Sequence, residues 1–299
     1  MKASIIFNPV AGAGKQKKLT RAVAAFNARG IRPMIRETKK RGDACYFAAE
    51  EVKRGSDIVI AAGGDGTINE VANGLAGSRV ALGILPMGVA NLLALEMGIP
   101  ADPVQAVEVI MSGTPQLTNP GYVLLREHGT EQEIKRYFLL MAGIGFDGGV
   151  LHDIKRSHIE SWGKAAYIIA GMRVIAKYTN TAFTIRVDGQ EELSAYSAIV
   201  GKSRFYGGRF MVTPRASLKD ECLDICVFKD KGSLKMLRNA FGILTGRHLR
   251  QSGIYYAKTR QLEITSHDEV YVQVDGDFLG SLPARLGVCK NALLIMYPG

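Results

Sequence analysis

The chain has 299 residues, of which 47% are hydrophobic and 22% charged, and its formal net charge is +10. This composition is that of a globular protein with a large core, and it excludes an intrinsically disordered chain. The positive charge favours a polyanionic partner such as a nucleotide, a nucleic acid or an anionic lipid surface. Nucleic acid is not expected, because the sequence has no helix-turn-helix, zinc-finger spacing or aromatic RNA-binding signature.

The first 112 residues alternate short apolar runs with helical stretches. Strands are predicted at Ala3–Phe7, Arg32–Arg36, Asp57–Ala62 and Val80–Leu85, and helices near 15–29, 43–54, 67–76, 89–97 and 102–112. Such alternation is typical of a parallel sheet covered by helices, in which ligands bind at the carboxyl ends of the strands. Turns at Asn8, Thr38, Gly64 and Gly88 follow the four strands and predict a nucleotide site.

The turn after the third strand is the most informative, because Gly63–Glu70 reads Gly-Gly-Asp-Gly-Thr-Ile-Asn-Glu. Glycines allow a tight turn there, and Thr67 with Glu70 matches a capping box, so a helix is expected to begin at Thr67. The N–H groups of such a helix start attract a phosphate. Asp65 has no evident structural role between its glycines, and an acid beside a phosphate site indicates a bridging cation.

From about residue 120 the pattern changes to short runs rich in β-branched and aromatic residues. Strands are predicted at Tyr137–Gly143, Ala182–Val187, Tyr196–Val200, Leu223–Phe228, Gln261–Thr265 and Glu269–Val274. These runs indicate a mostly antiparallel β domain. Two helices are expected within it, from Ser161 to about Lys177 and from Ser233 to about Arg250.

Neither membrane-spanning nor secretory segments are predicted. The apolar start of the chain is too short for a secretory signal, and no apolar run reaches the length that a membrane helix needs. A cytoplasmic protein with at most peripheral membrane contact is therefore expected. The four cysteines lack Cys-x-x-Cys spacing and are expected to be reduced and mostly buried.

The run Gly63–Leu75 resembles the signature of the diacylglycerol kinase catalytic-domain family, which includes bacterial lipid kinases and the sphingosine and ceramide kinases. NAD kinases share the shorter Gly-Gly-Asp-Gly-Thr core, but the continuation through Asn69-Glu70-Val71 and Asn73-Gly74-Leu75 is similar to the lipid branch. The resemblance implies an NAD kinase-like α/β domain of residues 1–120, to which 286–299 return, and an antiparallel β-sandwich domain of 121–285. It also implies an ATP-dependent lipid kinase that uses Mg²⁺ at an anionic membrane surface.

The same resemblance implies which residues contact ATP. Asn8-Pro9-Val10-Ala11-Gly12 is similar to the family's Asn-Pro-x-Ser-Gly element, with Ala11 in place of serine, and Thr38 matches a position that contacts ATP. The implied set is Asn8, Pro9, Gly12, Thr38, Gly63, Gly64, Asp65, Gly66, Thr67, Asn69, Glu70, Gly88 and Asn91. Asp65 is expected to organise a metal and water network as a catalytic residue, whereas nearby Asp43 is expected to be a helix N-cap.

The turn after the fourth strand departs from the family pattern at two positions. Leu85–Ala94 resembles the run Pro-x-Gly-Thr-x-Asn-Asp-Phe-Ala, but Val89 replaces the threonine and Leu92 replaces the aspartate. The threonine would donate to a phosphate, and the aspartate belongs to the metal network. Both departures therefore weigh against catalysis, while Asp65 keeps its place in the motif.

Two acidic turns in the β domain complete the implied site. Asp220 matches the family's metal-binding acid, with the backbone carbonyls of Ser217 and Cys222 as further Mg²⁺ ligands, although a solvent-exposed acidic turn would have the same sequence. In Asp275-Gly276-Asp277, the second acid matches the family's catalytic base, with aspartate in place of glutamate. Taken alone, the Asp-Gly pair predicts a hairpin turn.

Several alternatives stay open at this stage. The stretch Ser233–Arg250 is either a basic amphipathic membrane contact or a helix that packs its apolar side in the core. A soluble-substrate kinase of the NAD kinase type, a nucleic-acid-binding protein and a non-catalytic lipid or nucleotide sensor are the rival functions, the last because of Val89, Leu92 and Asp277. The acceptor lipid is not specified, and a homodimer is compatible with the sequence.

Overall fold

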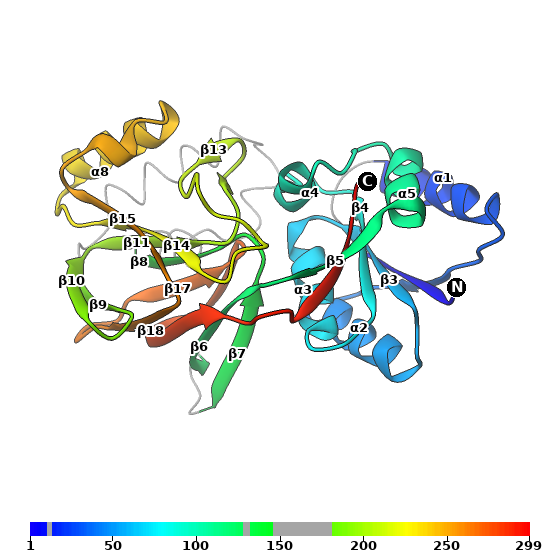
Figure 1. Cartoon of the computed structure of the whole chain (residues 1–299), viewed down its shortest axis with the longest axis horizontal. Helices are drawn as coiled ribbons and strands as arrows, with labels where there is room; N and C mark the ends of the chain where they lie inside the picture. The colour runs from blue at the N-terminus through cyan, green and yellow to red at the C-terminus, as the bar shows by residue number, and fades with distance from the viewer. Residues whose placement is uncertain (11–13, 128–131, 146–180) are drawn as a thin grey trace. The chain divides into compact units, whose positions relative to one another are not determined.

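The computed structural model describes residues 1–10, 14–127, 132–145 and 181–299. The chain divides into two compact units, Met1–Pro120 with Cys289–Gly299, and Gly121–Val288 (Figure 1). The helix predicted from Ser161 to about Lys177 lies outside the described residues, as does Gly12. Each unit is considered by itself below.

The first unit is built on a sheet of six described strands in the order β2-β1-β3-β4-β19-β5. Their bounds are β1 Ala3–Phe7, β2 Met34–Glu37, β3 Ile58–Gly63, β4 Ala81–Pro86, β19 Leu293–Tyr297 and β5 Thr114–Thr118. The first five strands pair in parallel, and β5 pairs antiparallel to β19. Every residue of β1, β3 and β4 is buried, because helices cover both faces of the sheet. The predicted α/β domain with a mostly parallel sheet is confirmed.

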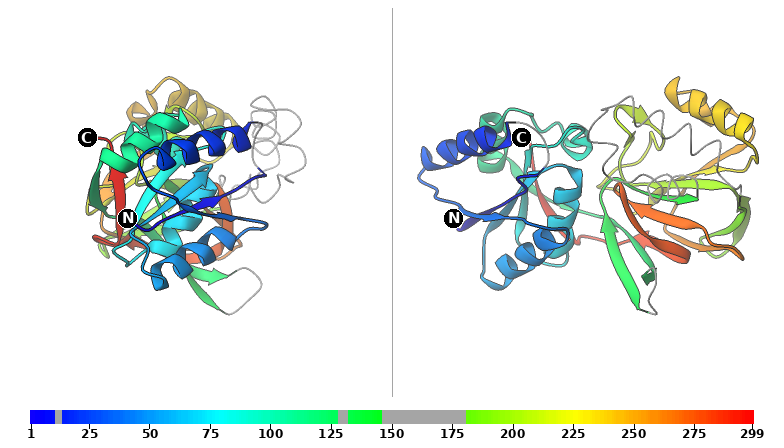
Figure 2. Two further views of the ribbon diagram at one scale, coloured as in Figure 1. Left: turned by 90° about the vertical axis from the view of Figure 1, so that its right-hand side faces the viewer. Right: turned by 180° about the vertical axis from the view of Figure 1, so that it is seen from behind.

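Helices cover the two faces of this sheet in pairs. On one side lie α1 (Lys15–Asn27) and α5 (Pro103–Ser112), and on the other α2 (Asp43–Lys53) and α3 (Asp65–Leu75) (Figures 1 and 2). The short α4 spans Leu92–Met97 and follows the turn after β4. Because β1 to β4 run in parallel, the turns that follow them all lie at one edge of the sheet.

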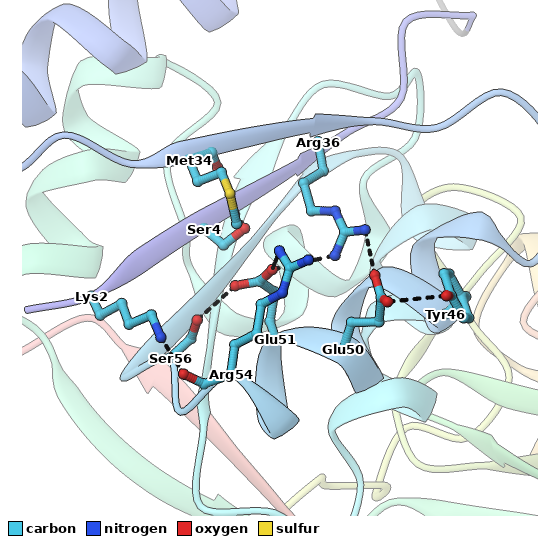
Figure 3. Close-up of polar contacts among 9 residues, drawn as sticks. All are labelled: Lys2, Ser4, Met34, Arg36, Tyr46, Glu50, Glu51, Arg54 and Ser56. Atoms are coloured by element: carbon cyan, nitrogen blue, oxygen red, sulfur yellow. Dashed lines mark hydrogen bonds and ion pairs between the residues drawn. The ribbon is translucent and has the colours of Figure 1, made fainter.

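A cluster of ion pairs ties the edge strand β2 to α2 (Figure 3). Arg36 lies 2.5 Å from a carboxylate oxygen of Glu50 and 3.3 Å from one of Glu51. Glu51 is buried, and its carboxylate also accepts hydrogen bonds from Arg54 and from the hydroxyl of Ser56. The buried charge is thus paired and hydrogen-bonded, which is the condition under which such a charge is tolerated.

The described strands of the second unit are antiparallel. Eleven of them form one sheet: β6 Gly121–Glu127, β7 Glu133–Phe138, β8 Met141–Gly145, β9 Phe183–Val187, β10 Glu191–Ala195, β11 Ser197–Gly201, β14 Leu223–Phe228, β15 Ile254–Thr259, β16 Gln261–Thr265, β17 Tyr271–Val274 and β18 Asp277–Val288. The short strands β12 (Phe205–Tyr206) and β13 (Phe210–Met211) pair with each other. A single cluster of buried aliphatic and aromatic side chains fills the unit. The predicted antiparallel β-sandwich is confirmed.

Some element boundaries differ from the predicted ones. The helix expected up to Arg250 ends earlier, as α8 (Ser233–Leu244), because Thr245 and the left-handed Gly246 terminate it before the 3₁₀ turn at His248–Arg250. All four cysteines are free, as expected, but only Cys226 is buried, so the expectation of mostly buried thiols was wrong.

Two glycines on α3 give a matched test of how α2 and α3 pack. A Cβ on Gly74 would lie 2.3 Å from the carbonyl oxygen of Cys45 and 2.7 Å from the Cβ of Ala48, so Gly74→Ala should lower the free energy of unfolding by about 1–3 kcal/mol. A Cβ on Gly66 would meet no atom within 4 Å, so Gly66→Ala should be neutral or stabilise by up to about 1 kcal/mol. Denaturant unfolding of both variants checks this, and equal effects would contradict it.

Candidate functional site

The turns after β3 and β4 touch each other at the carboxyl edge of the first sheet. A Cβ on Gly88 would lie 2.6 Å from the Cα of Gly64, so the two backbones pack closely there. A Cβ on Gly63 would lie 2.5 Å from the side chain of Thr67. Met87 donates its N–H to the carbonyl of Gly63 at 2.8 Å. Close packing therefore requires glycine at positions 63 and 88, whereas Gly66 has open space around it.

Asp65 has a structural role that the sequence did not indicate. Its two carboxylate oxygens accept hydrogen bonds from the backbone N–H groups of Leu92 (3.0 Å) and Leu93 (3.1 Å), at the start of α4. Burial raises the pKa of Asp65, and these N–H groups act in the opposite direction. The carboxylate thus holds the N-terminus of α4 and joins the turn after β3 to the turn after β4.

The capping box predicted for Thr67 and Glu70 is not formed. Helix α3 begins at Asp65 with Gly64 as its N-cap, and no side chain caps it. Glu70 instead accepts hydrogen bonds from the N–H groups of Gly42 (3.0 Å) and Ala44 (3.2 Å). The prediction was wrong because Glu70 caps the start of α2, whose residues lie 26 and 28 positions earlier in the chain.

The turn after β1 is hydrogen-bonded to the first turn of α3. Asn8 donates its side-chain amide to the hydroxyl oxygen of Thr67 at 3.1 Å, and its own side-chain oxygen accepts from the N–H of Val10. The ammonium of Lys15 lies 3.3 Å from the carbonyl oxygen of Asn8, and burial lowers the pKa of this lysine. The structure thereby brings Asn8 and Pro9 next to the Gly-Gly-Asp-Gly-Thr turn.

The turn after β2 lies beside that of β1. Thr38 is buried and donates its N–H to the carbonyl of Phe7 at 2.9 Å. Asp43 is the first residue of α2 rather than its N-cap, which is Gly42. Its carboxylate accepts hydrogen bonds from the N–H groups of Lys39 and Lys40, and these bonds lower its pKa. The expected N-cap role of Asp43 was therefore wrong, although the carboxylate does order the turn.

The turn after β4 is closed by Asn91. Its side-chain oxygen accepts from the N–H of Gly88 at 2.8 Å, and its amide donates to the carbonyl of Gly88 at 2.9 Å. Asn91 has a left-handed backbone with φ 48°, which asparagine tolerates better than most residues. Asn69 lies within α3 and is buried, and its backbone and side-chain oxygens accept hydrogen bonds from the side chain of Asn73. Its side chain therefore bonds within the helix.

In the second unit, Asp275 and Gly276 form the predicted hairpin turn between β17 and β18. Both residues have positive φ, as a type I′ turn requires. The carboxylate of Asp275 accepts hydrogen bonds from three backbone N–H groups, of Leu139 (2.9 Å), Leu140 (3.0 Å) and Met141 (2.8 Å). Asp277 is the first residue of β18. The hairpin that carries Asp277 is thereby fixed to the start of β8.

The turn that contains Ser217, Asp220 and Cys222 holds a buried lysine. The ammonium of Lys202 lies 2.6 Å from the carbonyl oxygen of Asp220 and 3.1 Å from that of Cys222. The carbonyl of Ser217 accepts from the N–H of Asp220. Burial lowers the pKa of Lys202 to about 8, which leaves most of it protonated at neutral pH. Sequence reasoning missed Lys202, because nothing in its neighbourhood distinguishes a buried lysine from an exposed one.

These residues do not fit a metal ion. Of the three oxygens assigned to the metal, the carbonyl of Cys222 accepts a hydrogen bond from the ammonium of Lys202, and the carboxylate of Asp220 accepts one from Lys258. The carbonyl of Ser217 accepts from the N–H of Asp220. Across the part of the chain that the structure describes, no group of three His, Cys, Asp or Glu side chains could hold a metal. No step of the chemistry is therefore assigned to a metal at this turn.

Comparisons with known proteins agree with the fold and the motifs. The family model described as the diacylglycerol kinase catalytic domain matches residues 2–123, and the one described as the YegS C-terminal NAD kinase beta sandwich-like domain matches 141–297. The diacylglycerol kinase of Bacillus subtilis is 31% identical over 95% of this chain and 92% of its own length.

Solved structures also have the same fold. A Bacillus anthracis protein assigned as a diacylglycerol kinase superposes with a TM-score of 0.78 at 25% identity, over 99% of this chain and 96% of that one. Yeast NADH kinase, in complex with NADH, shares the fold alone, with a TM-score of 0.56 at 10% identity over 100% of this chain and 84% of that one.

The role of Glu70 can be tested by one substitution. Glu70→Gln leaves one acceptor oxygen for the two N–H groups at the start of α2, so the free energy of unfolding should fall by about 1 kcal/mol. Glu37→Gln, at an exposed glutamate of β2, is the matched control and should change little. Denaturant unfolding checks both. Loss of ATP affinity with unchanged stability would show instead that Glu70 acts on the nucleotide.

Proposed function

Because the chain belongs to the diacylglycerol kinase catalytic-domain family, and so to the phosphotransferases, we propose that it is an ATP-dependent lipid kinase. It transfers the γ-phosphoryl group of ATP to the hydroxyl of a lipid such as diacylglycerol. ATP enters as its magnesium complex, so this metal belongs to the substrate and offsets phosphate charge. The observation that carries the proposal is the open N-terminus of α3 between the turns after β1 and β4.

The donor phosphates are proposed to bind at this helix start. The N-cap of α3 makes no side-chain hydrogen bond, and a Cβ placed on Gly66 would have no atom within 4 Å. N–H groups of a first helical turn have no partner within the helix, and together with the helix dipole they favour an anion. The carboxylate of Asp65 binds the N–H groups of Leu92 and Leu93 at the start of α4. Asn8, Thr38 and Asn91 border the same edge and are proposed to complete the nucleotide contacts.

The transfer needs no protein nucleophile. The lipid hydroxyl oxygen attacks the γ-phosphorus, the bond to the bridging oxygen of ADP breaks, and ADP leaves with that electron pair. The hydroxyl proton passes to a carboxylate, for which Asp277 is proposed as the general base. The three hydrogen bonds to Asp275 support this role, since they fix the turn from which Asp277 begins β18. Catalysis then rests on positioning and on charge stabilisation.

The test is transfer of label from γ-labelled ATP into mixed micelles of lipid extract. Asp277→Asn should lower the rate by about 100-fold or more, because general-base catalysis contributes at least this much. Asp268→Asn is the matched control, an exposed aspartate of the same unit, and should retain activity. Unchanged unfolding of both variants shows that the loss is catalytic.

The outcomes separate the rival functions. Label in NAD rather than in the organic phase would indicate a soluble-substrate kinase, and ATP binding without transfer would indicate a sensor. An active Asp277→Asn variant would remove this residue as the base while leaving the kinase itself established. Mass spectrometry of the labelled lipid then names the acceptor.

Contact with an anionic membrane is proposed for α8, which lies at the periphery of the second unit (Figures 1 and 2). Its large apolar side chains are exposed rather than packed in the core: Leu234 83%, Leu237 51%, Phe241 67% and Leu244 58%. The buried residues of α8 are Asn239 and Gly242, and the half-buried Met236, Ala240 and Ile243 lie on the same side of the helix. Lys235 and Arg238 lie on the same helix and pair with Asp230, at 3.0 Å and 2.5 Å. The exposed Arg247 and Arg250, which follow the helix, are the cations proposed to meet anionic headgroups. Among the described residues, no helix is long and apolar enough to cross a membrane.

Vesicle flotation tests this contact. The protein should float with vesicles rich in phosphatidylglycerol more than with pure phosphatidylcholine. Phe241→Ser should weaken this binding by about 10- to 100-fold, since burying a phenylalanine side chain contributes about 1.5–3 kcal/mol. Leu117→Ser, at an exposed leucine of β5 in the first unit, should leave it unchanged. Equal flotation with both kinds of vesicle would contradict the proposal.

A further inference from the structure

Lys202 is a fully buried lysine in the second unit. It follows β11, and its side chain has 0% relative exposure. Its ammonium donates to the carbonyl oxygens of Asp220 and Cys222, at 2.6 Å and 3.1 Å. These oxygens belong to the turn between Ser217 and Cys222, which leads into β14. An ammonium thus lies where oxygen atoms of this turn converge.

The charges around Lys202 balance without any added ion. Asp220 pairs with Lys258 through its carboxylate. Asp224 is buried and pairs in register with Gly201 on one side and Lys258 on the other. One oxygen of Asp224 accepts from the hydroxyl of Tyr256 at 2.7 Å, while the other has no hydrogen-bond partner among the described residues. Two lysine cations therefore face two carboxylates.

We propose that the ammonium of Lys202 is the resident cation of the turn Ser217–Cys222, in the place to which the family resemblance assigns a magnesium ion. The second unit of this chain then folds and holds β14 without a divalent metal. The inference concerns the architecture of the second unit and stands apart from the proposed kinase activity.

A divalent ion would meet two obstacles at this turn. Mg²⁺ requires near-octahedral oxygen ligands at 2.0–2.1 Å, and two of the oxygens assigned to it accept hydrogen bonds from Lys202 and Lys258. Its two positive charges would also lie beside the partly exposed ammonium of Lys258 and the buried ammonium of Lys202, and burial strengthens the repulsion from Lys202. An ammonium needs no such geometry, because its three donors can each reach a separate acceptor.

Thermal unfolding of the full chain tests the proposal. The wild type should unfold at the same temperature in excess EDTA and in millimolar magnesium chloride. Lys202→Met keeps the length of the side chain but removes its charge and its donors, so its unfolding temperature should fall by at least about 5 °C in both buffers. Lys219→Met removes the same charge from an exposed residue of the same turn and should have little effect.

Two results would overturn the proposal. One is a wild-type unfolding temperature that rises with magnesium, with the rise lost in Asp220→Asn, since the metal would then bind this turn despite Lys202. The other is a Lys202→Met variant as stable as the wild type. Where Lys202→Met yields no folded protein, the wild-type comparison decides alone. None of these measurements uses ATP or lipid, so they are independent of whether the chain is a kinase.

Discussion

The first unit depends on the contact between the turns that follow β3 and β4. Gly88 cannot carry a side chain there, since its Cβ would lie 2.6 Å from the Cα of Gly64. Asp65 secures the same contact through the N–H groups of Leu92 and Leu93. This acid is bound to α4, and the N-cap of α3 is Gly64, which has no side chain to cap the helix. The contact between these two turns thus orders the carboxyl edge of the sheet beside the N-terminus of α3.

Carboxylates that hold backbone N–H groups of another element recur in both units. Asp65 binds the start of α4, Glu70 the start of α2, and Asp275 the three N–H groups before and at the start of β8. A partly buried carboxylate with two or three such partners has its oxygen atoms satisfied by hydrogen bonds. The acids of these motifs therefore set the geometry of the loops, and the chemistry proposed for the chain depends on that geometry.

The sequence predicted the elements whose signal is local. The apolar runs of β1, β3 and β4 are buried at every residue, so composition alone identifies them as strands of a parallel sheet. The partners of the motif acids could not be predicted, because Glu70 binds a residue 26 positions away and Asp275 one 136 positions away. Local pattern even favoured the wrong partner for Glu70, namely Thr67. The sequence also could not decide whether the apolar residues of α8 pack in the core or contact a membrane. The helical period shows that these residues share one face, but it does not show what that face contacts.

The two departures from the family pattern after β4 differ in their consequences. Val89 is 86% exposed, so its side chain has no part in the packing of the turn. Leu92 is buried, and its backbone N–H binds Asp65. An aspartate at this position would bring a second carboxylate close to Asp65, where like charges raise each other's pKa. With leucine at position 92, the carboxylate of Asp65 is bound by backbone N–H groups. In the second unit, the carbonyl oxygens of Asp220 and Cys222 are bound by the ammonium of Lys202. Both units therefore balance their buried charges with groups of the chain itself, and in the proposed reaction the divalent cation arrives with ATP.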